Sequence, residues 1–362
     1  MKAKIFAFLP ARALGDFIIA AVVASSVREM FDEGELFVYY RDDRPYKNSI
    51  VSLMPNITGA FTSPAKGGVF PLDFLDPPGG RLVSGNDIFE QFKVKDSNLI
   101  LAGSMLNETA INSVRTTTLR IPPETVDSSD KALIDLGLDP KKWFVILYWK
   151  ESGYEFRWED AKRMIYDPAP YIAAIRHIIE DLGGQVVRLG HPTPTKLPKL
   201  KGLVDLAKAP NSEWLQIHAT ARARFFVGSS SGPASYGPAF GVPTAHTDQT
   251  LQLGVWNPDD YIVPQGIHYQ GKTFQAFEAY DAGYLFQEWK PESEVKYIRN
   301  TDQQIVAATD EMYNITHNCL GWRDLPVPVP RLPRPNAVAI PFPRIYPARE
   351  FLVPPTQRQR ST

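Results

Sequence analysis

The apolar residues of the first third of the chain fall into short runs separated by turns and polar stretches. Runs with the length of buried strands occupy residues 4–9, 35–40 and 97–102. The apolar stretch over residues 17–27, which follows a turn after the first of these runs, predicts a helix, and a second helix is predicted over residues 46–53. Residues 60–95 are rich in Gly and Pro and receive no assignment. This part of the chain therefore predicts strands that alternate with helices.

A second series of the same kind starts at residue 142. Residues 143–149 (WFVILYW) form a continuous apolar run, which is typical of a strand buried on both faces. Further strands are predicted at residues 185–189, 203–206, 224–228 and 242–246. Helices are predicted at residues 127–137, 167–182, 212–220 and in a stretch that ends near residue 240. Thr301 and Gln304 have the spacing of a capping box, which predicts a helix over residues 305–313.

The alternation of strands and helices indicates parallel sheets built from βαβ units. We expect an α/β protein with two facing Rossmann-like domains and a Pro-rich C-terminal tail. The predicted domains are residues 1–141, residues 142–300, and residues 301–362, the last being a helix followed by a Pro/Arg-rich tail. The tail either packs back on the protein or is disordered.

Composition excludes several classes of protein. The 362 residues carry 39 Lys and Arg against 40 Asp and Glu, a formal net charge of −1, which argues against a dedicated nucleic-acid-binding protein. The single cysteine, Cys319, excludes a disulfide framework and a Cys-based zinc site. No apolar stretch is long enough to span a bilayer. Because Arg12 and Asp16 interrupt the N-terminal apolar run, we interpret it as a strand and a helix and expect a cytoplasmic protein.

The tail differs in composition from the rest of the chain. Pro is frequent after Trp322, and the same segment carries an excess of Arg over acidic residues. Such a segment can dock a partner in polyproline II form. Its positive charge also suggests peripheral contact with the inner face of an anionic membrane, which is a hypothesis only.

The first group of candidate functional residues is Gly15-Asp16, directly after the first predicted strand. Glycine permits a tight turn there. The Asp16 carboxylate can serve as an N-cap of the following helix, or it can accept a proton from a substrate hydroxyl. Both interpretations stay open on the residues alone.

The second group is the segment FFVGSSSGPASYGPAFGVP, residues 225–243. A strand leads into Ser229, Ser230, Ser231, Gly232 and Pro233 before a helix of small residues. Hydroxyls and backbone N–H groups at such a helix start suit a phosphate or a sugar phosphate. The alternative is an ordinary strand–helix turn with a serine N-cap.

The third group contains positively charged residues near strand ends. Lys150 follows the predicted strand 143–149, and Arg188 lies near the end of strand 185–189, just before Gly190 and His191. Arg157 and Arg163 belong to the same group. Ligands of open parallel sheets bind beyond the carboxyl ends of the strands, so these cations are candidates for binding a diphosphate. His191 either stacks on a base or binds phosphate, or is an ordinary loop residue.

Motifs for metals and common cofactors are missing from the sequence. The histidines lack the spacing of a metal site, and there is no Walker A, GxGxxG, GxSxG or DxD pattern. We therefore expect no metal site and no cofactor. An enzyme of this kind that handles nucleotide-sugars would neutralise the diphosphate with Lys, Arg and helix termini.

The segments "LGDFIIA" and "FFVGSSSGPASYGPAFGVP" together resemble bacterial GT-B glycosyltransferases, with the lipopolysaccharide heptosyltransferases as well-known relatives. The stretch "YWKESGYEFRWEDAKRMIYDPAPYIAAIRHIIEDLGGQVVRLGHP" is similar to bacterial glycosyltransferases encoded at surface-polysaccharide loci. The resemblance covers residues 1–30 and 143–250.

This resemblance implies an N-terminal acceptor domain and a C-terminal nucleotide-sugar domain. It implies that Asp16 is the catalytic base and that residues 230–233 contact the donor. Heptosyltransferases usually carry Asp before the Ser-Gly pair and His shortly after it, whereas this chain has Ser230 and Ser235. That departure counts against ADP-heptose as the donor.

The sequence thus predicts a metal-independent hexosyl or related transferase. It would move a sugar from a nucleotide-sugar to a hydroxyl of a glycan or glycoconjugate acceptor, with inversion if Asp16 is the base. Its partners are then the donor and the acceptor, without nucleic acid, and the oligomeric state is not predicted. Two alternatives remain: a nucleotide-sugar epimerase or hydrolase on the same fold, and a non-catalytic nucleotide-sugar-binding or scaffold protein.

Overall fold

The computed structural model describes residues 3–10, 13–64, 98–106, 111, 116–151, 164–191, 195–209, 212–249, 260–274, 295–316, 321–324 and 346–347. The chain divides into two compact units. The first comprises Met1–Pro122 and Leu332–Asn336, and the second comprises Pro123–Arg331 and Ala337–Thr362.

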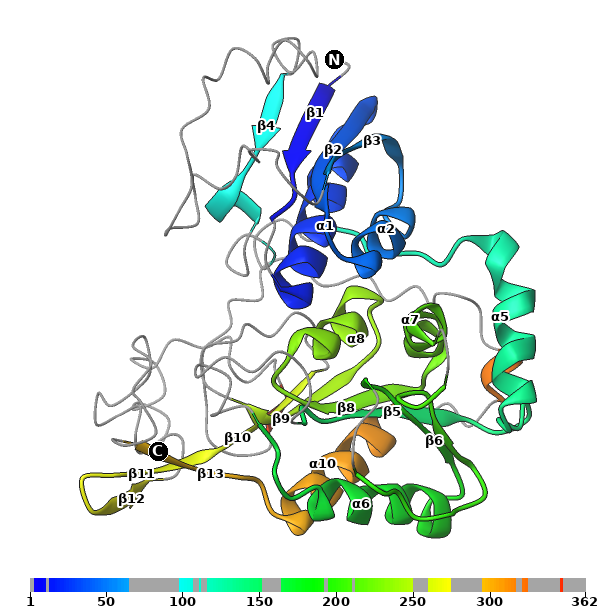
Figure 1. Cartoon of the computed structure of the whole chain (residues 1–362), viewed down its shortest axis with the longest axis vertical. Coiled ribbons are helices and arrows are strands. Elements are labelled where there is room, and N and C mark those ends of the chain that lie inside the picture. The colour runs from blue at the N-terminus through cyan, green and yellow to red at the C-terminus, as the bar shows by residue number, and fades with distance from the viewer. Residues whose placement is uncertain are drawn as a thin grey trace. The chain divides into compact units, whose positions relative to one another are not determined.

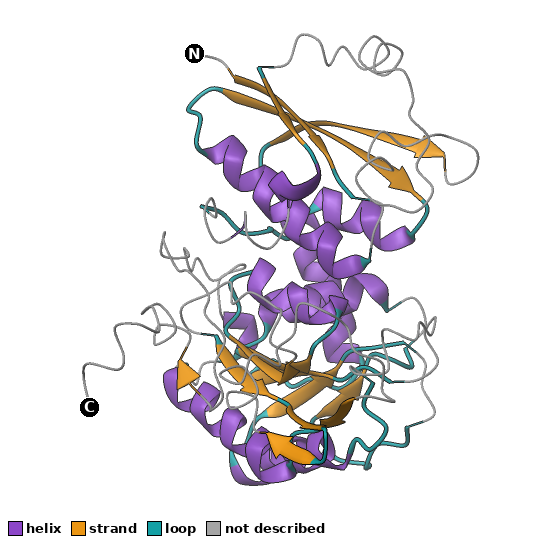
Figure 2. Cartoon of the chain, turned by 90° about the vertical axis from the view of Figure 1, so that its left-hand side faces the viewer, coloured by secondary structure: helices purple, strands orange, loops and turns teal. Residues whose placement is uncertain are grey.

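The first unit is built on a four-stranded parallel sheet with strand order β3-β2-β1-β4. Its strands are β1 (Ala3–Phe8), β2 (Gly34–Asp42), β3 (Ile57–Pro64) and β4 (Leu99–Leu101). Helices α1 (Leu14–Glu29) and α2 (Pro45–Ser52) lie on one face of this sheet (Figure 2). A short 3-10 helix, η3 (Gly103–Leu106), follows β4. The strand order is the first part of the Rossmann order.

Both faces of this sheet bury apolar side chains. Helix α1 is apolar around most of its surface, and Phe17 packs edge-on against Tyr40 with the ring centroids 5.9 Å apart. On the opposite face of the sheet, Phe6, Phe8 and Tyr39 form an aromatic cluster. Strand residues alternate between the two faces, so adjacent residues of β1 and β2 supply both layers.

The second unit is built on a seven-stranded sheet with strand order β14-β10-β9-β8-β5-β6-β7. The strands are β5 (Phe144–Tyr148), β6 (Gln185–Arg188), β7 (Leu203–Asp205), β8 (Phe225–Ser229), β9 (Thr244–Gln249), β10 (Tyr261–Pro264) and β14 (Tyr346–Pro347). All pair in parallel except β14, which is antiparallel to β10. Taken from β5 to β10 in chain order, the strands have the complete Rossmann order 3-2-1-4-5-6.

Helices cover both faces of this sheet (Figure 1). On one face lie α6 (Ala169–Arg176), which continues as the π-helical η5 (His177–Asp181), and α10 (Asp302–Ile315). On the other face lie α7 (Glu213–Arg222), the 3-10 helix η6 (Gly232–Ser235) and α8 (Tyr236–Ala239). A 3-10 turn, η7 (Trp322–Asp324), follows later in the chain.

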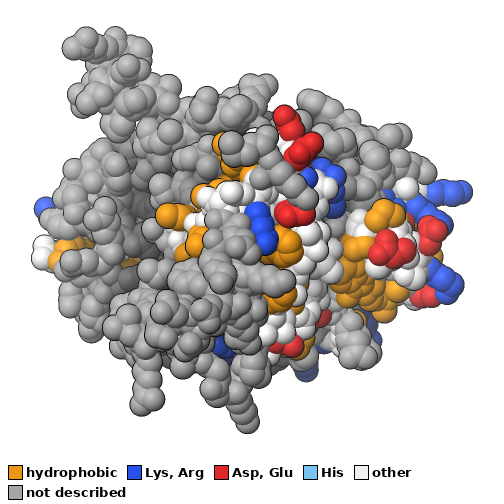
Figure 3. Space-filling model, turned by 90° about the horizontal axis from the view of Figure 1, so that it is seen from above, with side chains coloured by type: hydrophobic (Ala, Val, Ile, Leu, Met, Phe, Trp, Pro, Cys, Tyr) orange, Lys and Arg blue, Asp and Glu red, His pale blue; other side chains and the backbone are white. Residues whose placement is uncertain are grey.

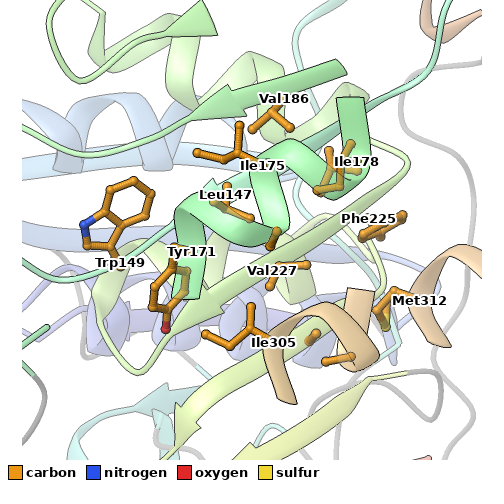
Figure 4. Packing of buried hydrophobic residues seen from close by; sticks show 14 of the residues in the cluster. Leu147, Trp149, Tyr171, Ile175, Ile178, Val186, Phe225, Val227, Ile305 and Met312 are labelled. Atoms are coloured by element: carbon orange, nitrogen blue, oxygen red, sulfur yellow. The ribbon is translucent and has the colours of Figure 1, made fainter. Parts of the chain in front are cut away.

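The main core of the second unit lies between the sheet, α6 and α10 (Figure 4). Leu147 and Val227 from the central strands meet Ile175 from α6 and Ile305 from α10. The predicted capping box at the start of α10 is confirmed. The backbone N–H of Gln304 donates to Thr301 Oγ1 at 3.3 Å, and the Thr301 N–H donates to Gln304 Oε1 at 2.9 Å.

A small antiparallel sheet completes the second unit. Its strands β11 (Gly266–Tyr269), β12 (Lys272–Phe274) and β13 (Val295–Ile298) have the order β12-β11-β13. Ile267 and Val295 are its buried centre.

The predicted fold class is confirmed, and the predicted strands of both halves are present with shifted ends. Two details differ. Strand β3 begins just before the unassigned residues 60–95 and includes the first of them. The helix expected to end near residue 240 is a 3-10 turn followed by the single turn of α8. The Pro/Arg-rich tail lies outside the described residues apart from β14 and the turn η7.

Within the described residues, no helix combines the length and the apolar character that a bilayer crossing requires. On the face shown in Figure 3, acidic and basic side chains of the described residues lie intermixed.

Helix α5 (Pro123–Asp135) belongs to the second unit, although the sequence placed residues 1–141 in the first domain. The reason is a buried ion-pair cluster. Asp130 is paired with Arg222 of α7 and lies 2.7 Å from His218 Nε2 of the same helix. Trp214 Nε1 adds a hydrogen bond to Ser129 Oγ at 3.0 Å. These contacts attach α5 to α7.

The charge of Asp130 is stabilised within this cluster. Burial by itself would raise the pKa of Asp130, but hydrogen bonds from His218 and Arg222 and the charge of Arg222 outweigh it, so the pKa is lowered from 3.8. A lowered folded-state pKa means that the stabilisation is present above the unfolded value and is lost as the pH falls below it.

We expect Asp130→Asn to lower the free energy of unfolding by about 3 kcal/mol at pH 7, because the buried Arg222 loses its compensating carboxylate. The measurement is urea denaturation of the variant and the wild type. The difference should shrink as the pH falls below about 4. Asp135→Asn is the matched control on the same helix, since Asp135 forms an exposed pair with Lys131 and should change stability by less than about 1 kcal/mol. Equal effects of the two substitutions would contradict the role of Asp130.

Candidate functional site

The carboxyl ends of β5 and β8 are neighbours at the point where the strand order of the second unit reverses. On one side the sheet continues through β6 and β7, and on the other through β9 and β10. Ligands of open parallel sheets bind beyond the strand ends at such a switch point. Lys150 follows β5 and Ser229 ends β8, so two sequence-predicted groups meet there.

Hydrogen bonds join the serine turn to the end of β5. The Lys150 backbone N–H donates to Ser229 Oγ at 2.9 Å, and the Tyr148 hydroxyl donates to Ser231 Oγ at 3.0 Å. Ser230 differs from its neighbours: its side chain is buried, and Oγ has no hydrogen-bond partner among the residues that the structure describes. A buried hydroxyl without a partner lowers the stability of the folded protein, and a ligand that bonds to Ser230 Oγ would remove that cost.

Gly232 and Pro233 begin η6 and are half-buried. The short η6 and α8 replace the longer helix expected from the sequence, so a helix dipole contributes little at this turn. The polar groups that the turn presents are hydroxyls and backbone N–H groups.

Lys150 is held by its backbone on two sides. Besides the bond from its N–H to Ser229, its carbonyl accepts a hydrogen bond from Ile165 N–H at 2.8 Å. The side chain of Lys150 is half-buried. The position of this residue at the switch point is therefore defined by β8 and by the segment before α6.

Arg188 is buried and surrounded by carboxylates. It is 1% exposed, and its Nη2 donates to Glu151 Oε2 at 2.6 Å. Nη1 lies 3.4 Å from both carboxylate oxygens of Asp205. The guanidinium also stacks on Trp149, 4.3 Å from the ring centroid. Its charge is thus compensated within the unit, and contact of Arg188 with a ligand phosphate stays a prediction.

Glu151 is the centre of this arrangement and was not predicted from the sequence. Its carboxylate accepts hydrogen bonds from Trp149 Nε1 at 2.6 Å, from Arg188 and from the Thr195 hydroxyl. The only sequence signal was an acidic residue directly after Lys150. Through these hydrogen bonds the buried carboxylate connects the ends of β5 and β6 to the segment before β7.

Trp149 continues this network toward β9. Its ring stacks on Tyr171 with centroids 5.4 Å apart, and the Tyr171 hydroxyl donates to Asp248 Oδ2 at 2.8 Å. Burial, followed by the Asp248 charge, raises the pKa of Tyr171 well above 10, so this hydroxyl stays protonated. Burial also raises the pKa of Asp248, whose other carboxylate oxygen accepts from Asn300 N–H at 2.8 Å.

The turn after β6 contains Gly190 and His191. Gly190 has a φ of +146°, a backbone conformation that residues with a Cβ atom rarely adopt. Gln216 of α7 bonds to both backbone groups of Gly190, at 3.0 Å to its N–H and 2.8 Å to its carbonyl. His191 follows directly and is half-buried. The sequence did not point to Gln216, which lies 26 residues after Gly190 in the chain.

Asp16 belongs to the other unit, in the first turn of α1. It follows β1, which with β4 forms the switch point of that unit's sheet. The N-cap of α1 is Ala13, which makes no side-chain capping bond, so the interpretation of Asp16 as an N-cap is wrong. Gly15 also lies inside the helix. At this position the helix dipole favours an ionised carboxylate.

Arg157 and Arg163 lie outside the described residues. In the part of the chain that the structure describes, no group of three or more His, Cys, Asp or Glu residues could hold a metal ion.

Comparison with solved structures identifies the architecture. A glycosyl transferase of family 9 from Veillonella parvula DSM 2008 superposes with a TM-score of 0.54 and 11% identity, covering 87% of this chain and 98% of that one. ADP-heptose lipopolysaccharide heptosyltransferase II from E. coli superposes with a TM-score of 0.52 and 12% identity, covering 88% of this chain and all of that one. The chain has the GT-B fold. Its sequence matches no protein-family model and no curated protein sequence.

We expect Arg188→Ala to lower the free energy of unfolding by about 3 kcal/mol, because the buried Glu151 carboxylate loses its strongest positive partner. Denaturation in urea measures the effect. Arg176→Ala is the control, since Arg176 and Glu180 form a pair that is about half exposed, and we expect a loss below about 1 kcal/mol. An unchanged unfolding midpoint for Arg188→Ala would show that the Arg188–Glu151 pair does not stabilise the second unit.

Proposed function

We propose that the protein is a glycosyltransferase that moves a sugar from a nucleotide-sugar to a hydroxyl group of a glycan or glycoconjugate. The observation that carries the proposal is the fold shared with two glycosyltransferases over nearly their whole length. The donor would bind at the carboxyl ends of β5, β6 and β8, and the acceptor would bind at the first unit.

The chemistry of the second-unit switch point supports a nucleotide-sugar. Ser230 has a buried hydroxyl without a partner among the described residues, which a phosphate or sugar oxygen could satisfy. Lys150 is bonded to the serine turn through its backbone N–H, so the proposal places its positive charge beside a phosphate bound at that turn. A positive charge that is already in place lowers the barrier by stabilising the charge that develops on the leaving nucleotide.

Asp16 is proposed as the general base. As an ionised carboxylate in the first turn of α1 it can take the proton of the acceptor hydroxyl. The deprotonated oxygen then attacks the anomeric carbon, and the bond from that carbon to the diphosphate breaks with the electron pair leaving on the phosphate oxygen. A single displacement of this kind inverts the anomeric centre. The residues named need no metal ion.

In this scheme Arg188 supports the donor site indirectly. Its ion pair with Glu151 joins the end of β6 to the end of β5, where Lys150 lies. The proposal therefore assigns direct contact with the donor to Lys150, His191 and the serine turn. Gly190, Gly232 and Pro233 shape the backbone around them, and Arg157 remains a candidate from its sequence position.

The donor site is tested by calorimetric titration of the protein, without metal, against UDP, GDP, ADP, CMP and CDP. We expect one of these nucleotides to bind, and Lys150→Ala to weaken its binding at least about tenfold, because a charge-assisted contact is lost. Lys141→Ala is the control, since Lys141 is an exposed lysine before the amino end of β5. Absence of binding to all five nucleotides would favour the scaffold alternative.

The base is tested with Asp16→Asn. We expect this variant to lose transfer by a factor of about 100 or more while its nucleotide affinity stays unchanged, because the amide cannot accept the proton. The measurement is release of nucleotide from the matching nucleotide-sugar in the presence of a set of oligosaccharide acceptors. Asp32→Asn, an exposed carboxylate beyond the other end of α1, is the control.

Two results would contradict this assignment. Loss of nucleotide binding in Asp16→Asn would make Asp16 a donor ligand instead of the base. Wild-type turnover of the donor at the same rate without any acceptor would favour the epimerase or hydrolase alternative.

A further inference from the structure

Two glutamine side chains hold the two ends of strand β6 in the same way. At its amino end, Gln185 Oε1 accepts from the Asp139 N–H at 2.7 Å, and Gln185 Nε2 donates to the Asp139 carbonyl at 3.0 Å. Beyond its carboxyl end, Gln216 Oε1 accepts from the Gly190 N–H at 3.0 Å, and Gln216 Nε2 donates to the Gly190 carbonyl at 2.8 Å. Each amide thus bonds to both backbone groups of a single residue.

The Gln216 amide pairs with the backbone of Gly190 just beyond the strand pairing that the structure describes for β6. Up to Leu189 the chain is still paired with β5, through the Leu189 N–H and the Leu147 carbonyl at 2.9 Å. At Gly190 the backbone turns with a φ of +146°. A primary amide has a donor and an acceptor side by side, so it can pair with a peptide group as a strand would.

The Gln216 amide is itself held in position. Its Nε2 also donates to Ser212 Oγ at 3.0 Å, and its backbone N–H bonds to the Ser212 carbonyl at 2.8 Å. Helix α7, which carries Gln216, is attached to α5 by the pairs from His218 and Arg222 to Asp130. The contacts of Gln216 therefore determine how the Gly190–His191 turn is oriented relative to α7.

We propose that Gln216 is a positioning residue that sets the conformation of the Gly190–His191 turn and, through it, the place of His191 at the donor site. The second half of this statement rests on the proposed function, whereas the first half stands on the contacts of Gln216 alone. Gln185 makes an equivalent pair of bonds at the amino end of β6, whereas the switch point lies at the carboxyl ends of the strands. It is therefore a matched control.

The experiment compares Gln216→Glu with Gln185→Glu in the full-length protein. In each variant the carboxylate still accepts from the backbone N–H but cannot donate to the carbonyl. We expect similar losses of stability in urea. Only Gln216→Glu should weaken binding of the nucleotide found in the calorimetric panel, by about tenfold. Only this variant should move the NMR signals of the His191 ring, recorded without nucleotide and assigned with His191→Gln.

Lowering the pH gives a further readout. A protonated carboxyl group has one donor and one acceptor, as the amide does. The His191 signals and the relative nucleotide affinity of Gln216→Glu should therefore return toward the wild-type values as the pH is lowered from 8 to about 4, close to the ordinary pKa of a glutamate side chain, each compared with the wild type at the same pH.

Unchanged His191 signals in Gln216→Glu would overturn the proposal, and so would equal losses of nucleotide affinity in the two variants. If the wild type binds none of the five nucleotides, the proposed donor site is contradicted, and the His191 signals still decide whether Gln216 positions the turn.

Discussion

The burial of β5 on both faces and its pairing along both edges is the constraint around which the second unit is organised. All five residues of the strand are buried, and its backbone pairs in parallel with β6 on one side and β8 on the other. A strand of this kind can present polar groups only at its ends. Strands β6 and β8 lie on opposite sides of β5, and the strand order reverses between β5 and β8. The carboxyl end of β5 therefore lies at the switch point, where Lys150 and the serine turn meet.

Charges buried behind this edge connect the strand ends to one another. The Glu151–Arg188 pair has both partners almost completely buried, with Trp149 stacked on the guanidinium. Removing two charges from water is costly, and such a pair adds little net stability compared with apolar residues. The pair instead holds the end of β5 and the end of β6 in fixed positions relative to each other. If the two ends moved apart, each partner would become a buried uncompensated charge. This is consistent with a positioning role for Arg188 behind the proposed donor site.

The two solved glycosyltransferases whose fold this chain shares are 11% and 12% identical to it in sequence. A shared fold does not by itself determine the chemistry of a site. The chemistry proposed for this chain therefore depends on its own residues, among them Ser230, whose buried hydroxyl has no hydrogen-bond partner among the described residues.

The sequence by itself determined the α/β class, the strands of both sheets that form continuous apolar runs, and the capping box of α10, because these depend on local periodicity and local hydrogen bonds. It also indicated that Lys150 and the serines follow strand ends. Only the tertiary structure decided that Arg188 is enclosed by Glu151 and Asp205, that α5 joins the second unit through Asp130, and that Gln216 holds Gly190. Each of these contacts joins residues far apart in the chain. The sequence alone does not show whether a charged or amide side chain is buried or exposed. Its partners, and with them its role, exist only once the strands and helices have packed.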